Sequence, residues 1–343
     1  MTIPDQNRIP RNAEAVLEER KKRILNVKTL VFLIVSVFIA YFLLGKLDIA
    51  KTWDSIRNAD AVMVIVSCLV YSASNFFKML RFRLMLGDYG IPLFDLYAIT
   101  SYHNFYNQIM PARTGELTFV YYLKKIGNAD VSKGLHILVV TRIFDFIVIS
   151  AFFICSIIFV FGARTSMALI AAGAAFFIIS IIALFNLKWI VILCGRILRT
   201  LTKNERMQKN RLVGALRGRI DVLVHEFSSF KTARFVPALA VTSILTWSAL
   251  YFLFYLTIRS FGIDIGLIQS VAGSTGGVLT NVLPINSFGS FGTLEAGWTG
   301  GFILVGMSEQ DAIFTGFGYH FISFFASAAI ALFCYVVTIA RKG

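Results

Sequence analysis

The sequence contains few charged residues, few prolines and few cysteines. Only 15% of its 343 residues are charged, whereas soluble domains average about a quarter, so an ordinary soluble domain is excluded. The four cysteines lie in or beside apolar runs, and their spacing is not typical of disulfide pairs or metal sites. We therefore expect no bound metal, and we interpret Cys68, Cys155, Cys194 and Cys334 as apolar packing residues.

The patterns of common catalytic and nucleotide-binding sites are also missing. There is no G-x-S-x-G elbow, no His/Cys cluster with metal spacing and no G-x-x-x-x-G-K-[ST] loop. We therefore expect no cofactor and no ATP-driven pump. Any transport would be driven by a gradient or be facilitated.

What the chain has in abundance is apolar sequence, since 57% of its residues are hydrophobic. Several apolar runs reach the roughly 18 to 20 residues that a bilayer span needs. They predict an all-α polytopic membrane protein with about six full spans, at 29–46, 61–80, 135–162, 165–187, 235–260 and 312–340. The first run is too long for a signal-peptide core and lacks a small-residue cleavage site, so we expect it to be retained.

The basic residues predict the topology. Seven of them lie between Arg8 and Lys28, and eleven, against three acids, lie in 188–234. Because Lys and Arg mark cytoplasmic loops, we expect both termini on the cytoplasmic side of the cell (inner) membrane. Apolar positions in 212–230 form one helical stripe, which predicts an amphipathic helix along the inner headgroups or a solvated linker helix. Attraction to anionic lipid accounts for the net charge of +14 without a nucleic-acid partner.

Two further apolar regions, 94–123 and 264–305, are each interrupted and predict re-entrant hairpins. The stretch "MPAR" divides the first and "LPINSFGSFG" the second, leaving pieces too short to cross comfortably. Basic flanks place the entry of the first hairpin on the cytoplasmic side, and charge-poor flanks place that of the second outside. The predicted hairpin-breaking residues are Pro111, Gly115, Pro284, Gly289 and Gly292.

The two halves of the chain match each other weakly. Asn107 and Asn281 are 174 positions apart, and Pro111 and Pro284 are 173 apart. Span, hairpin and span recur in the same order from opposite faces, which is typical of transporters with inverted repeats and broken helices. The alternative is that Asn, Pro and Gly simply recur at turns.

These patterns divide the chain into successive segments. They are a cytoplasmic segment 1–28, a first membrane repeat 29–162, a fourth span 163–187, a basic amphipathic loop 188–234 and the rest of a second repeat 235–340.

A helix broken within a bilayer persists only where it is buried in protein or lines water. Arg113 stands at the predicted start of a half-helix, whose positive end attracts anions, and a lipid phosphate is the most available anion there. Glu116 is either its counter-charge or a helix cap. Snorkelling of Arg113 to the inner interface is the alternative.

Other polar residues in the apolar segments are candidate substrate-binding residues. Arg142 and Asp145 share one helical face, as a functional pair or as a fixed structural one. His320 is either a titrating group or a packing residue, and Glu295 either a functional acid or a helix cap. Asn104, Asn107 and Asn281 could bind a headgroup, although bonding to freed backbone is favoured.

Three stretches carry a resemblance to a known family. "NQIMPARTGELTFVYYLKK", "VVTRIFDFIVI" and "LPINSFGSFGTLEAGWTGGFILVGMSEQDA" resemble the lysylphosphatidylglycerol synthase transmembrane, or flippase-like, family over about 61–340. The third stretch departs from the family pattern, because Thr293-Leu294 stands where Val-Arg is usual and a second anion contact is thereby lost.

The resemblance implies movement of a phospholipid or lipid-linked headgroup between leaflets. The aminoacyl-transferring domain of the fused synthases is absent from this sequence. We therefore expect a flippase for an anionic phospholipid or a polyprenyl-phosphate-linked lipid. The alternatives are an integral-membrane transferase with Glu116 or Glu295 as base, or a non-catalytic partner of a separate lipid-modifying enzyme. The sequence is compatible with an oligomer.

Overall fold

The computed structural model describes residues 34, 37–110, 113–162, 166–201, 232–282 and 288–341, and the regular elements among them are helices. Five of these helices are long and apolar enough to cross a membrane. They are α3 (Ala61–Leu86), α6 (Val131–Phe161), α7 (Met167–Phe185), α11 (Thr232–Ser260) and α14 (Glu309–Ala340). The prediction of an all-α, multi-pass membrane protein agrees with this architecture.

Several helices differ in their bounds from the predicted spans. α3 continues to Leu86, beyond the predicted end at residue 80, and this places Arg81 and Arg83 inside the helix. Of the first predicted span, 29–46, the structure describes residues 34 and 37–46, and 37–44 are helical. In the predicted basic loop, α8 (Leu187–Leu201) is a helix, and the stripe at 212–230 lies outside the described residues.

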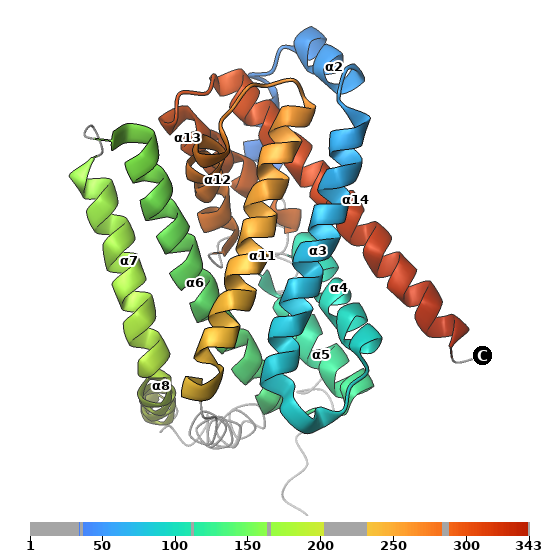
Figure 1. The fold of residues 1–343 in the computed structure, drawn as a ribbon, viewed down its shortest axis with the longest axis vertical. Coiled ribbons are helices and arrows are strands. Elements are labelled where there is room, and N and C mark those ends of the chain that lie inside the picture. Colours follow the sequence, from blue (N-terminus) through green and yellow to red (C-terminus); the bar gives the residue numbers. More distant parts are fainter. Residues whose placement is uncertain are drawn as a thin grey trace, which may run out of the picture.

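Short helices occupy both interrupted regions. The first contains α4 (Leu93–Ile109) and α5 (Glu116–Gly127), and the second contains α12 (Leu267–Val282) and α13 (Thr293–Leu304). α5 begins three residues later than predicted, so Arg113 belongs to the preceding turn. α13 likewise begins later than the predicted 288, because a 3-10 turn occupies Phe288–Ser290. α4 and α5 lie near one end of the bundle, whereas α12 and α13 lie near the other end, where α2 (Ile49–Arg57) also lies (Figure 1).

The helices of the two halves pack in a mirrored pattern. α3 lies against α11, and the backbone N–H of Asp60 donates to the Ser260 carbonyl across their ends at 2.8 Å. α4 packs on α14 as α12 packs on α6, and α5 packs on α6 as α13 packs on α14. The pattern is unchanged when each element is exchanged for its counterpart in the other half.

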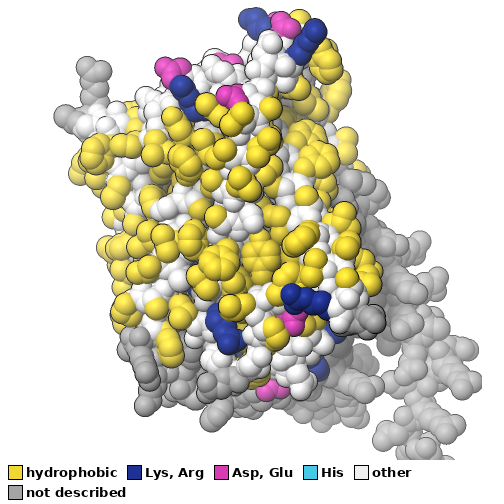
Figure 2. All heavy atoms as spheres, turned by 45° about the vertical axis from the view of Figure 1, so that its right-hand side comes forward, with side chains coloured by type: hydrophobic (Ala, Val, Ile, Leu, Met, Phe, Trp, Pro, Cys, Tyr) yellow, Lys and Arg dark blue, Asp and Glu magenta, His cyan; other side chains and the backbone are white. Residues whose placement is uncertain are grey.

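An apolar core surrounds each hairpin, and the outside of the bundle is apolar as well. Phe82, Ile99 and Phe119 are fully buried around the first hairpin. Around the second, Phe254 meets the Trp298 ring edge-on at 5.4 Å, and Trp298 also stacks on Tyr319. Figure 2 shows hydrophobic side chains over the middle of one face, with Lys, Arg, Asp and Glu towards its two ends. This distribution is expected for a surface in contact with lipid tails.

Glycines allow α12 and α13 to pack backbone to backbone. A Cβ atom on Gly276 would overlap the carbonyl oxygen of Gly297, and one on Gly297 would lie 2.5 Å from the Thr280 side chain. Small residues at such a seam are the usual means of close helix packing in membranes. Gly300, on the same helix as Gly297, is exposed, and a Cβ there would meet nothing within 4 Å.

Gly276 provides a test of this packing. We expect Gly276→Ala to destabilise the folded protein by about 1–3 kcal/mol because the hairpin must separate. The matched change Gly300→Ala should leave stability unchanged or slightly raised, since alanine favours a helix more than glycine does. The midpoint of thermal unfolding in detergent measures both. Equal effects of the two substitutions would contradict the close seam.

Candidate functional site

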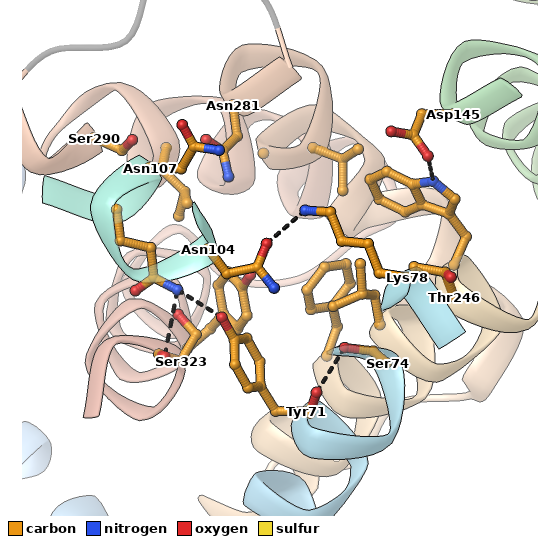
Figure 3. A pocket seen from close by; sticks show the side chains of 18 of the residues that line it. Tyr71, Ser74, Lys78, Asn104, Asn107, Asp145, Thr246, Asn281, Ser290 and Ser323 are labelled. Carbon is orange, nitrogen blue, oxygen red and sulfur yellow. Dashed lines mark hydrogen bonds between the residues drawn. The ribbon is translucent and has the colours of Figure 1, made fainter. Parts of the chain in front are cut away.

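A cavity of about 160 Å³ lies in the interior of the bundle where the ends of the two hairpins approach each other. It is lined from α3, α4, the turn before α5, α6, α11, α12, α13 and α14. Figure 3 shows Lys78, Asn104, Asn107 and Asn281 around it, and its polar lining includes Tyr71, Ser74, Lys78, Arg81, Asn104, Asn107, Gln108, Arg113, Arg142, Asp145, Asn281, Ser290, His320 and Ser323. The volume accommodates a small headgroup or several waters.

Arg113 connects the two hairpins. It has a positive φ of 55° in the turn between α4 and α5, a conformation rare for a residue other than glycine. Its Nε donates to the carbonyl oxygen of Asn281 at 2.5 Å, and its Nη1 donates to Glu116 at 2.8 Å. The guanidinium thus joins the end of α12 to the start of α5.

Glu116 is shared by two arginines. The carboxylate oxygen Oε1 that accepts from Arg113 also accepts from Arg142 of α6. All three side chains are only partly exposed, at 15% for Arg113, 25% for Glu116 and 22% for Arg142. Since one carboxylate faces two guanidiniums, this trio carries an excess of positive charge.

The closest ionic partner of Asp145 is Arg81 on α3, and not the predicted partner Arg142 on α6. Asp145 Oδ1 accepts from Arg81 at 2.6 Å and from Trp247 Nε1 at 2.9 Å, whereas the distance from Asp145 to Arg142 is 3.7 Å. The side chains of Arg81 and Asp145 are 1% and 8% exposed. Spacing along α6 places Arg142 near Asp145, but it could not reveal the partner on α3. Arg142 pairs more closely with Glu116.

Glu295 lies behind the cavity wall and is fully buried. One carboxylate oxygen accepts from the backbone N–H of Gly292 at 2.7 Å, which caps α13, and the other pairs with Nδ1 of His320 at 2.6 Å. His320 itself lines the cavity, and Phe291 stacks on its ring. Both oxygens of Glu295 are therefore engaged in holding the second hairpin and His320.

The predicted hairpin residues are placed by backbone geometry. Gly289 and Gly292 have positive φ values of 63° and 84°. Gly115 has an ordinary φ, but a Cβ there would lie 2.6 Å from the Tyr106 carbonyl oxygen, so it permits α4 to lie close to the start of α5. Pro111 and Pro284 lie outside the described residues.

The three asparagines considered from the sequence all lie at the cavity, where Asn104 and Asn107 bond to other side chains. Asn107 and Asn281 line the cavity. Asn281 supplies the carbonyl that Arg113 binds, and the Nδ2 of Asn107 contacts the ring of His103 at 3.2 Å. Asn104 also lines the cavity and accepts from Lys78.

Sequence reasoning missed Lys78 and Arg81, because it treated them as markers of the cytoplasmic boundary. Both line the cavity from α3. A signal for them exists in the sequence, since Tyr71, Ser74, Lys78 and Arg81 recur at spacings of three, four and three. This polar stripe along one face of an apolar helix predicts a polar interior.

The described residues include no cluster of His, Cys, Asp and Glu side chains that could hold a metal ion. The guanidinium, ammonium and amide donors in the cavity wall suit an anionic oxygen ligand.

Residues 29–331 match the family model described as the lysylphosphatidylglycerol synthase TM region. The chain belongs to this family. The match confirms the resemblance drawn from the three sequence stretches and assigns the chain to a lipid-related class of membrane domains. A search of curated proteins found no match.

The pairing of Arg81 with Asp145 can be tested by stability. We expect Asp145→Asn to cost about 3–5 kcal/mol, because it leaves a buried guanidinium without its carboxylate. The double change Arg81→Met with Asp145→Leu should cost less, since no single buried charge remains. The midpoint of thermal unfolding in detergent reports all three proteins.

Asp264→Asn is the matched control for this prediction. Asp264 pairs with Arg259 at an exposed site, where ion pairs contribute little. Its removal should hardly change the midpoint. If the two Asp→Asn changes had similar effects, the Arg81–Asp145 pair would not be the internal link described above.

Proposed function

We propose that this protein moves lipids with anionic headgroups between the two leaflets of the membrane. The single observation that carries the proposal is the cavity with Lys78, Arg81, Arg113 and Arg142 in its wall, at the junction of the two hairpins. Charged side chains inside a membrane domain are costly, and by default they mark a substrate or ion pathway.

The mirrored packing supports an inverted repeat. α4 with α5 and α12 with α13 lie near opposite ends of the bundle (Figure 1), and each hairpin packs on the last long helix of its own half. We infer that the hairpins enter the membrane from opposite faces and that the cavity lies near the midplane, as in transporters built from inverted repeats. The basic residues Lys124 and Lys125 in the last turn of α5 then face the cytoplasm.

Exchange of partners at Glu116 gives a path for the headgroup. A lipid phosphate entering the cavity competes with Glu116 for Arg113 and Arg142, because phosphate and carboxylate bind guanidinium in the same geometry. Release of Arg113 from Glu116 weakens the link between the first hairpin and the carbonyl of Asn281. Movement of one hairpin against the other then opens the cavity to the other leaflet, while the tails stay in the bilayer.

Arg113→Gln tests the proposal directly. In liposomes containing the purified protein, we expect leaflet exchange of fluorescent phosphatidylglycerol to fall at least tenfold, because the headgroup loses a charged contact and the hairpins lose their link. Arg57→Gln, on the exposed surface of α2, is the matched control and should exchange lipid at the wild-type rate. Exchange is followed by dithionite quenching of the outer leaflet.

The same assay separates the alternatives. Equal exchange in wild-type, Arg113→Gln and protein-free liposomes would refute the transport proposal. Chemical conversion of the added lipid without exchange would instead indicate a membrane transferase. Activity that appears only after a lipid-modifying enzyme is added would indicate a non-catalytic partner.

A further inference from the structure

Lys78 differs from the other cations of the cavity because no carboxylate accompanies it. Its Nζ donates to the side-chain oxygen of Asn104 at 2.5 Å (Figure 3). No Asp or Glu oxygen of the described residues lies within 4.0 Å of this nitrogen, whereas Arg81, Arg113 and Arg142 each have a carboxylate within that distance. The ammonium group is thus held beside the cavity by a neutral acceptor.

A chain of hydrogen bonds fixes that acceptor. The Nδ2 of Asn104 donates to Asn75 at 2.7 Å, and the Nδ2 of Asn75 donates to the Ser101 hydroxyl at 2.8 Å. Asn75 and Ser101 are buried between α3 and α4. Because the amides are oriented from behind, the oxygen of Asn104 points at Lys78, and the ammonium group is preorganised for a ligand.

The charges around the cavity do not balance. Lys78 and three arginines line it, and two carboxylates, Asp145 and Glu116, pair with the arginines. Even when Glu295, which is paired with His320 behind the cavity wall, is counted as a third carboxylate, one positive charge remains in excess. In a low-dielectric interior such an excess calls for a negatively charged ligand.

We propose that the cavity binds a terminal phosphoryl group, as in a lipid phosphomonoester or diphosphate, and that Lys78 is the residue that selects it. This rests on the proposed function. A phosphomonoester carries about −1.5 to −2 charges near neutral pH and offers three free oxygens, whereas the phosphodiester of phosphatidylglycerol carries one charge. Donors reach the cavity from α3 through Lys78, from the turn before α5 through Arg113 and from α6 through Arg142. Two sources share this chemistry: phosphatidic acid and a polyprenyl phosphate.

Binding to the purified full-length protein in uncharged detergent tests the inference. The probes are phosphatidic acid, a polyprenyl phosphate and phosphatidylglycerol, and binding is measured by the rise in the midpoint of thermal unfolding with lipid concentration. We expect at least one phosphomonoester lipid to bind about tenfold or more tightly than phosphatidylglycerol. Whichever of phosphatidic acid and the polyprenyl phosphate binds more tightly is the lipid that supplies the phosphoryl group.

Lys78→Gln should abolish this preference and bring phosphomonoester binding to the level of phosphatidylglycerol, because it removes one charged hydrogen bond. Lys78→Arg, which keeps the charge, should retain most of the preference, and an unchanged midpoint of thermal unfolding in the absence of lipid shows that the variants are folded. Lys51→Gln, exposed on α2, is the matched control and should bind like the wild type.

Equal binding of all three lipids by the wild type, or a preference that survives Lys78→Gln, would overturn the inference. Leaflet exchange of the same lipids is measured in parallel. Preferential binding without any exchange would leave the phosphoryl site standing and refute transport. Exchange of phosphatidylglycerol without a phosphomonoester preference would support transport and refute the phosphoryl site.

Discussion

The hydrogen bond from Arg113 to the carbonyl of Asn281 joins the two hairpins at the cavity. Asn281 stands in the last turn of α12, where carbonyl groups lack a partner within the helix. In a membrane such a group costs several kcal/mol unless something else satisfies it. The guanidinium satisfies it from the opposite hairpin. A short helix can therefore end inside the protein because a side chain from the other half completes it.

The same constraint explains why the charged residues inside the bundle lie together. Arg81, Asp145, Arg142 and Glu116 come from α3, α6 and the start of α5, and each finds an opposite charge inside the bundle. Outside this network, the spanning helices present apolar side chains such as Phe159 and Leu332. The ionic groups thus stabilise one another inside the bundle. The cations that exceed the carboxylates in number give the cavity its positive charge.

Much of this arrangement could be predicted from the sequence, because hydropathy and helix breakers are local signals. The interrupted segments, the long helices and the presence of Arg113, Arg142, Asp145 and His320 at the cavity follow from such patterns. The partner of Asp145 could not be predicted, because Arg81 lies 64 residues away on another helix. Lys78 was not predicted at the cavity, because a lysine near the end of an apolar helix is also typical of the membrane boundary.

α14 has 32 residues and is therefore about 48 Å long, whereas the hydrocarbon layer is about 30 Å thick. Figure 1 shows it running obliquely across the bundle, and at its end the Arg341 guanidinium lies over the Phe94 ring at 4.1 Å. Its later turns present Leu332, Phe333 and Val336 outward. A helix of this length is accommodated by tilting, and a thicker bilayer favours a more upright one. Since His320 is carried on this helix, a change in its tilt would move one wall of the cavity.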